Sequence, residues 1–95
     1  TVRCFRPPYG NKDPATVRIP KERGLATILW RRDGQDWSQP GVDQIVRGNL
    51  DTRFDGGRGV VVLHDGGASR SQTVAALPKL IDALRARGYT FVQLC

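Results

Sequence analysis

The chain of 95 residues has one histidine, two cysteines and no apolar run that approaches the length of a membrane span. The cysteines, Cys4 and Cys95, lie near opposite ends and show neither metal-ligand spacing nor a CxxC pattern, which argues against a zinc-binding or redox motif. They can pair with each other in an oxidising compartment, stay apart as small buried residues, or pair with residues outside the chain. The sequence leaves these alternatives open.

Acidic residues are also scarce. Nine Asp and Glu stand against 15 Lys and Arg, which gives a formal net charge of +6. An excess of basic residues invites a nucleic-acid partner. These basic residues are scattered among acids, and they form no stripe with aromatic residues of the kind that single-strand binders use. A nucleic-acid-binding domain therefore rests on charge alone, and we disfavour it.

Predicted strands and helices alternate along the chain. The strands are expected at residues 1–5, 25–30, 60–63 and 89–94, and the helices at residues 11–23, 42–52 and 72–87. The order βαβαβαβ predicts an α/β fold with parallel strands. The remaining segments, 31–41 and 55–59, are expected to be a loop and a turn. At this length the chain can hold one domain with a small core.

Caps and prolines set the expected limits of the helices. Asp13 followed by Pro14 predicts the start of the first helix, and Pro20 is expected to end or kink it. Ser71 is the expected cap of the last helix, and Pro78 predicts either a kink or a later start. The apolar face expected for that helix comprises Val74, Leu77, Leu80, Ile81 and Leu84.

The single histidine, His64, follows the most apolar predicted strand, VVVL at residues 60–63. In a parallel sheet the carboxyl ends of all strands lie at one edge, where ligands bind. The segments FRPPYG, DGQDW and LHDGG are therefore expected to converge there with a histidine, an arginine, acids and aromatic residues. The simpler interpretation is a histidine that satisfies a local hydrogen bond, but the convergence favours acid–base chemistry beside an aromatic surface.

Three of these segments resemble a known family. FRPPYG, DGQDW and VVLHD, in this order and at these spacings, resemble the third, fourth and fifth motifs of the polysaccharide deacetylases, the NodB-homology proteins of carbohydrate esterase family 4. The stretch from His64 to Leu94 resembles the closing helix and strand of that family. The resemblance implies that residues 1–95 are the C-terminal portion of a single NodB-like domain, and that its βαβαβαβ pattern is half of a distorted (β/α) barrel.

The same resemblance implies a metal that this chain does not bind alone. Family members use a divalent metal, usually zinc, to polarise the acetyl carbonyl and activate water. Their TFDDGP segment, which carries the catalytic base, and their HxxxH metal pair are absent from this sequence. The resemblance therefore implies that an N-terminal half, in the same or a separate chain, supplies the base and the metal ligands.

Roles in catalysis carry over to four residues. His64 resembles the general acid that protonates the leaving amine, and Asp36 resembles the carboxylate that orients it and supports its cationic form. Arg6 resembles the arginine that orients the catalytic base, and Tyr9 resembles the residue whose backbone N–H helps to hold the oxyanion. Without the resemblance, Arg6 is equally well a surface ion-pair partner and Asp36 a turn residue.

Trp37 and Val62 match positions that line the pocket for the acetyl methyl group. As residues without a function, Trp37 would be a core aromatic and Val62 a strand core residue. The pair Arg31-Arg32 departs from the family, which often has an acid followed by a hydrophobic residue there.

The leading hypothesis is metal-dependent deacetylation of an N- or O-acetylated carbohydrate of chitooligosaccharide, peptidoglycan or xylan type, outside the cell or in its envelope. The alternative is a non-catalytic carbohydrate-binding or partner-docking module.

Overall fold

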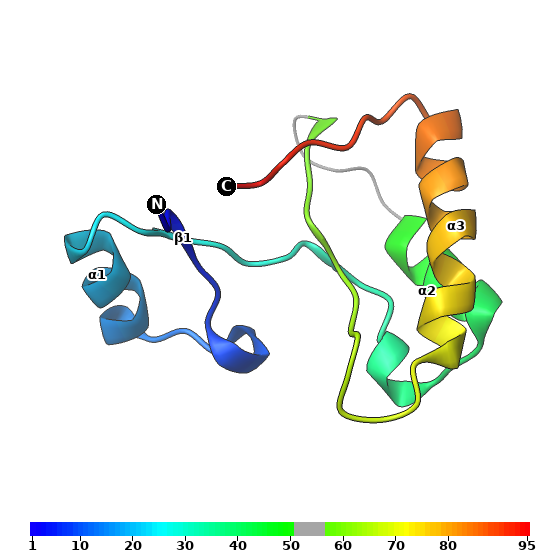
Figure 1. Cartoon of the computed structure of the whole chain (residues 1–95), viewed down its shortest axis with the longest axis horizontal. Helices are drawn as coiled ribbons and strands as arrows, with labels where there is room; N and C mark the ends of the chain where they lie inside the picture. Colours follow the sequence, from blue (N-terminus) through cyan, green and yellow to red (C-terminus); the bar gives the residue numbers. More distant parts are fainter. Residues whose placement is uncertain (51–56) are drawn as a thin grey trace. The chain divides into compact units, whose positions relative to one another are not determined.

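The computed structural model describes residues 1–50 and 57–95, which form two compact units, Thr1–Trp30 with Val92–Cys95 and 31–91. In chain order the elements are β1 (Cys4–Phe5), α1 (Pro14–Glu22), β2 (Ala26–Thr27), β3 (Arg32–Asp33), α2 (Val42–Leu50), β4 (Val61–Val62) and α3 (Ser71–Ala86), as Figure 1 shows. Two 3-10 turns, η1 (Pro8–Gly10) and η2 (Asp36–Ser38), follow β1 and β3. Among the described residues no helix is long and apolar enough to cross a membrane.

The first unit is a βαβ arrangement in which β1 and β2 pair in parallel, with Cys4 opposite Ala26. Helix α1 begins where the sequence predicts. The Asp13 carboxylate accepts from the backbone N–H of Thr16 at 2.8 Å, and the Thr16 hydroxyl oxygen accepts from the backbone N–H of Asp13 at 2.7 Å. This reciprocal capping box satisfies two backbone donors that a helix start leaves free, and Pro14 occupies the first helical position, where no donor is needed.

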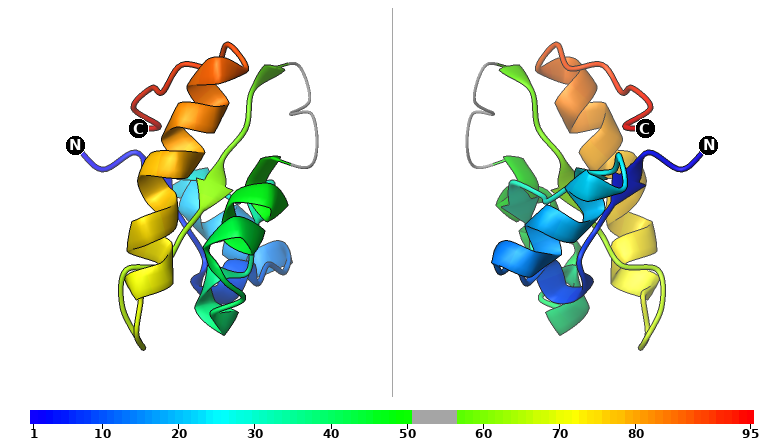
Figure 2. Two further views of the ribbon diagram at one scale, coloured as in Figure 1. Left: turned by 90° about the vertical axis from the view of Figure 1, so that its right-hand side faces the viewer. Right: turned by 90° about the vertical axis from the view of Figure 1, so that its left-hand side faces the viewer.

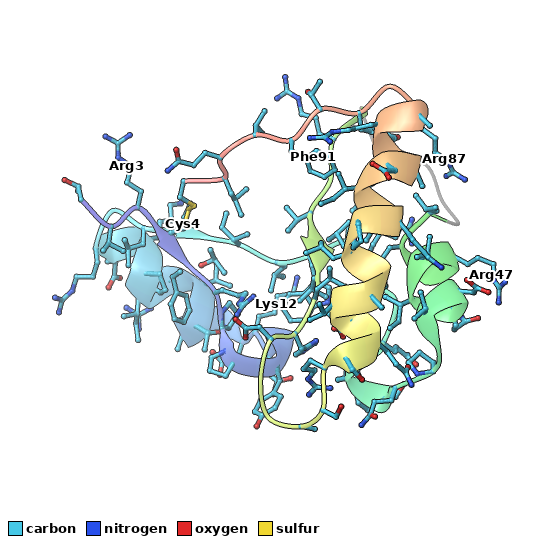
Figure 3. The ribbon with its side chains drawn as sticks, turned by 45° about the vertical axis from the view of Figure 1, so that its right-hand side comes forward. Arg3, Cys4, Lys12, Arg47, Arg87 and Phe91 are labelled. Atoms are coloured by element: carbon cyan, nitrogen blue, oxygen red, sulfur yellow. A yellow bond between two sulfur atoms is a disulfide. The ribbon has the colours of Figure 1, made fainter. Side chains whose placement is uncertain are left out.

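A disulfide joins Cys4 on β1 to Cys95 in the same unit, with 6.1 Å between the two Cα atoms. The yellow bond beside the Cys4 label in Figure 3 marks it. The structure therefore selects one of the alternatives that the sequence left open for the two cysteines, namely pairing with each other.

The second unit places α2 and α3 side by side, as the left view of Figure 2 shows. In the same unit β3 and β4 pair in parallel, with Asp33 opposite Val62. Among its described residues, the buried apolar side chains come from α2, β4 and α3. They are Ile45, Val62, Ala76, Leu80 and Leu84, and around Leu80 and Leu84 pack the partly buried Val46, Leu50, Val61, Leu63 and Tyr89. The apolar faces of both helices thus pack into one small core.

The strands predicted at residues 1–5, 25–30 and 60–63 are present but shorter, as Cys4–Phe5, Ala26–Thr27 and Val61–Val62. The strand pattern also differs from the prediction in three other places. Residues 89–94 form no strand, and the described strands make two parallel pairs rather than one continuous sheet. Instead of pairing, Phe91 lies under the Arg85 guanidinium, 5.7 Å from its ring centre. Strand β3 lies inside the predicted loop 31–41 and was missed because Arg32 and Asp33 carry charged side chains, whereas backbone pairing with β4 decides the conformation.

Helix α3 also departs from the prediction. Ser71 is its first helical residue and Arg70 its N-cap, which makes no side-chain capping bond, so the predicted Ser71 cap is wrong. Pro78 does not delay the start. It lies on the exposed side together with Val74, whose carbonyl the proline cannot bond.

The buried stripe of α3 is shifted from the expected apolar face. The buried residues are Thr73, Ala76, Leu80 and Leu84. Val74, expected in the core, is 69% exposed, and Leu77 is exposed as well. The polar residue Thr73 is thus buried in the core, whereas the apolar pattern had placed Val74 there.

The other helix limits were predicted closely. Helix α1 continues for two residues past Pro20 to Glu22, so Pro20 does not end it at once. Helix α2 is confirmed from Val42 to Leu50, and the last part of the predicted helix and the start of the predicted turn at Asp55 lie outside the described residues.

Two glycines let the end of β3 lie against α2. A Cβ atom at Gly34 would come within 2.7 Å of the Ile45 carbonyl oxygen and 2.6 Å of the Asn49 side-chain nitrogen. A Cβ at Gly48 would lie 2.9 Å from the Cα of Gly34. The Ile45 carbonyl oxygen and the Gly34 Cα are backbone atoms, so these two contacts cannot be relieved by turning a side chain.

We expect Gly34→Ala to lower the free energy of unfolding by about 1–3 kcal/mol, as overpacking does in well-packed interiors. Urea denaturation of the full chain measures the change. Gly66→Ala is the matched control, because a Cβ there meets nothing within 4 Å. Equal stability of the two variants would contradict the close packing of β3 on α2.

Candidate active site

Asp36 and His64 come together because the strands before them are paired in parallel. Both residues follow the carboxyl ends of β3 and β4, so the two loops leave the same edge. One carboxylate oxygen of Asp36, Oδ1, lies 2.7 Å from Nδ1 of His64, and the other, Oδ2, accepts from the backbone N–H of His64 at 2.8 Å. The carboxylate therefore holds both the main chain and the ring of the histidine.

The turn that carries Asp36 is built by its own polar neighbours. The Asp33 carboxylate accepts from the backbone N–H of Gln35 at 2.8 Å, and Gln35 takes a left-handed conformation at φ 53°. The hydroxyl of Ser38 donates to the Gln35 carbonyl at 2.7 Å. This local geometry directs Asp36 inward, where it is 1% exposed, while Trp37 is 51% exposed.

Burial and hydrogen bonding act in opposite directions on Asp36. Removal from water raises the pKa of its carboxyl group. Hydrogen bonds from the His64 backbone, the His64 ring and the Thr73 hydroxyl lower the pKa by more than burial raises it, so the net pKa lies below its ordinary value of 3.8. Asp36 is consequently charged at neutral pH. Because a carboxylate faces Nδ1, we assign the proton of the neutral ring to that nitrogen. The other ring nitrogen, Nε2, is then free of this contact, on a side chain that is 39% exposed.

Three side chains from the N-cap and first turn of α3 complete the site, and sequence reasoning missed all of them. The Thr73 hydroxyl donates to Oδ2 of Asp36 at 2.8 Å. The Arg70 guanidinium donates to the carbonyls of Gly66 and Trp37 at 2.9 and 3.2 Å. Gln72 accepts from the backbone N–H of Gly41 at 2.7 Å. Only Thr73 left a signal in the sequence, because its helical spacing places it on the same face as Leu80 and Leu84.

Arg6 and Tyr9 belong to the first unit, so their convergence with Asp36 and His64 stays a prediction. Arg6 is exposed just after β1. Tyr9 lies in η1 with φ 58° and ψ 11°, a left-handed conformation that a tyrosine rarely adopts and that tends to cluster at functional sites. The next residue, Gly10, also has a positive φ and packs so closely on the Trp30 ring that a Cβ would come within 2.7 Å of it.

Trp37 follows Asp36 directly, and Val62 precedes His64 by two residues. The two side chains differ in exposure. Val62 is a buried residue of β4, and the Trp37 carbonyl receives the Arg70 bond described above. That the two side chains line an acetyl pocket stays a prediction.

The described residues do not provide a metal site. In the ranges 1–50 and 57–95, no group of three or more His, Cys, Asp or Glu side chains could hold a metal ion. The two best donors, Asp36 and His64, are directed at one another. The side chains present therefore do not fit a metal on their own.

Similarity searches relate the chain to carbohydrate deacetylases. No protein-family model matches it. Peptidoglycan-N-acetylglucosamine deacetylase from Bacillus cereus is 46% identical over 92 residues, which are 95% of this chain and 42% of that protein. Chitooligosaccharide deacetylase from Sinorhizobium fredii is 38% identical, over 99% of this chain and 47% of that protein.

A solved peptidoglycan N-acetylglucosamine deacetylase in complex with an N-hydroxybenzamide compound superimposes on 98% of this chain with a TM-score of 0.87 and 28% identity. The chain belongs to the polysaccharide deacetylases of carbohydrate esterase family 4. The resemblance seen in the three motifs is thereby confirmed, and so is an α/β fold. The chain spans less than half the length of these family members, 42 to 47%.

We expect Asp36 to make stability depend on acid pH. Because its folded-state pKa lies below the ordinary value of 3.8, its stabilisation is fully present above that value and is lost as the pH falls through the folded-state pKa. The free energy of unfolding should therefore fall less between pH 7 and pH 3 in Asp36→Asn than in the unaltered chain.

Denaturant titrations at several pH values measure this difference. Asp82→Asn, which removes an exposed carboxylate from α3, is the control and should follow the unaltered chain. If Asp36→Asn keeps the full acid dependence, the carboxylate is not held as described.

Proposed function

We propose that this chain supplies the general acid of a metal-dependent deacetylase that acts on an acetylated carbohydrate of chitooligosaccharide, peptidoglycan or xylan type. The observation that carries the proposal is the buried Asp36 carboxylate, which contacts both the ring and the backbone of His64. Relatives named for peptidoglycan N-acetylglucosamine and chitooligosaccharide support an N-acetylated substrate.

His64 has the geometry of an acid that completes amide hydrolysis. When the tetrahedral adduct of water and the acetamide collapses, the C–N bond breaks and the leaving nitrogen needs a proton. The imidazolium of His64 donates that proton from Nε2, since Nδ1 faces Asp36. The charged carboxylate of Asp36 stabilises the imidazolium beforehand and keeps the ring oriented. With an O-acetyl substrate, the same proton goes to the leaving alcohol oxygen.

The rest of the catalytic machinery is assigned to a partner segment. Membership of the family implies a divalent metal, and we propose zinc held by ligands outside this chain, because the described residues do not fit one. The N-terminal half of the same domain would bring these ligands and the catalytic base. Arg6 would orient that base, and the backbone N–H of Tyr9 would donate to the oxyanion.

Trp37 and Val62 are proposed to line the pocket for the acetyl methyl group. The half-exposed ring of Trp37 offers an apolar surface, and Val62 lies two residues before His64 on β4. The two parallel strand pairs would then be parts of a distorted (β/α) barrel. The Cys4–Cys95 disulfide favours a protein that works outside the cell or in its envelope, since such bonds persist in oxidising compartments.

The second candidate is a non-catalytic carbohydrate-binding or partner-docking module. It is favoured by the lack of a metal-binding side-chain cluster in the described ranges. The exposed Trp37 ring suits either candidate, because sugars stack on aromatic faces.

We expect the isolated 95-residue chain to release no acetate from N-acetylchitooligosaccharide, with or without added zinc. A chimera in which this chain replaces the aligned segment of the Bacillus cereus relative should release it, because that relative supplies the remaining part of the domain. Acetate release measures both. A chimera that folds and binds zinc but binds the sugar without releasing acetate would favour the binding module.

In that chimera, we expect His64→Ala to lower kcat by a factor of roughly 100 to 10,000, the range typical of a lost general acid. Bound zinc should stay unchanged, because its ligands lie elsewhere. Asp36→Asn should also lower kcat, because the ring loses the carboxylate that holds its orientation. Asp65→Asn, beside the histidine in sequence, is the control.

The double variant of His64 and Asp36 should lose little more activity than His64→Ala alone, since the two residues act as a unit. Losses that multiply independently, or a loss of zinc in His64→Ala, would refute the general-acid assignment.

A further inference from the structure

The N-cap and first turn of α3 contact the segment 36–41 through three side chains, and one of them differs in what it contacts. Arg70 ends on the carbonyl of Trp37, and Gln72 ends on the N–H of Gly41. Both contacts are to backbone. Thr73 instead donates to Oδ2 of Asp36, the carboxylate that faces His64. Of the three side chains, only Thr73 therefore contacts a side chain of the site, and the other two contact backbone groups of the segment 36–41.

The Thr73 contact is buried and well oriented. Asp36 and Thr73 are 1% and 6% exposed, and their oxygens are 2.8 Å apart. A threonine inside a helix usually bonds a carbonyl of its own preceding turn, and its branched side chain has few rotamers. Here the hydroxyl is turned across to another segment. A stiff side chain on a 16-residue helix thus presents the donor from a fixed direction.

The two donors on Oδ2 decide where the second carboxylate oxygen points. The terminal torsion of an aspartate is broad, so a carboxyl group held at one point can rotate. Oδ2 accepts from the His64 backbone and from Thr73, each at 2.8 Å, and these bonds fix the carboxyl plane. Oδ1 is then left 2.7 Å from Nδ1 of His64.

We propose that Thr73 is a positioning residue for the His64 acid, holding the Asp36 carboxylate in the orientation that faces Nδ1. The proposal rests on the proposed function only where it speaks of an acid. The Thr73–Asp36–His64 contact itself can be tested without any activity.

The charge state of Asp36 provides an independent readout. The Thr73 hydroxyl is one of the groups that lower the pKa of Asp36, whereas burial raises it. Loss of the hydroxyl should therefore raise that pKa and cause protonation at higher pH. His64, after β4, is the titratable side chain that contacts Asp36 in the described residues, and the nearby Arg70 charge of α3 bonds to the Gly66 and Trp37 carbonyls.

The experiment compares Thr73→Val, Thr73→Ala and Thr73→Ser with Gln72→Ala. Valine keeps the shape and loses the hydroxyl, serine keeps the hydroxyl, and Gln72→Ala removes a structural contact of the same turn. The carboxyl carbon of Asp36 is followed by NMR as the pH is lowered, in the full chain. The pH–rate profile is measured in the chimera.

We expect Thr73→Val and Thr73→Ala to titrate Asp36 at higher pH and to lower kcat about tenfold with KM unchanged, a loss typical when the partner behind a functional group is removed. The acid limb of the profile should move to higher pH. Thr73→Ser should restore both properties. Gln72→Ala should lower the melting temperature without moving the titration or the acid limb.

The proposal is overturned if Asp36 titrates as in the unaltered chain in both hydroxyl-free variants, or if Thr73→Ser is as impaired as Thr73→Val. It is also overturned if Gln72→Ala shifts the titration equally, because the effect would then come from general loosening of the turn. If Thr73→Val does not fold, Thr73→Ala and Thr73→Ser decide. Full activity of Asp36→Asn would remove the proposed function but not the titration result.

Discussion

A charged carboxylate that is withdrawn from water must be satisfied by donors, and this requirement governs the second unit of the chain. Asp36 accepts from the backbone of His64 and from Thr73 while its other oxygen faces the His64 ring. The carboxylate and its partners come from three separate segments, the turn after β3, the residue after β4 and the first turn of α3. The burial of one charge is therefore possible only when these segments are all in place.

Sequence reasoning succeeded where a local signal decides the structure. The Asp13-Pro14 start of α1 and the position of His64 after a buried strand both follow from neighbouring residues. It failed where a distant partner decides. The charged strand β3 exists because it pairs with β4, and residues 89–94 have strand-forming side chains but no strand. Thr73 was overlooked because its partner lies 37 residues away.

The described residues contain only part of what a member of this family would need for catalysis. The similarity covers 95% or more of this chain but less than half of the relatives, and the described residues hold an oriented histidine without a metal-binding cluster. In the proposed deacetylase, acid and metal chemistry would then meet only where two segments of a domain come together. In such an arrangement, the Asp36–His64 pair is organised by contacts internal to one unit and does not depend on the metal for its geometry.

The disulfide between Cys4 and Cys95 closes almost the whole chain into a covalent ring, since 91 positions separate the two cysteines. A single cut of the backbone anywhere inside that ring leaves one connected molecule. A fragment is released only by a second cut, or by a reductant that opens the disulfide after the first. Gel analysis under non-reducing conditions would therefore show a nicked protein as intact. An exposed loop can in this way be cleaved by a protease without separating the segments that build the site.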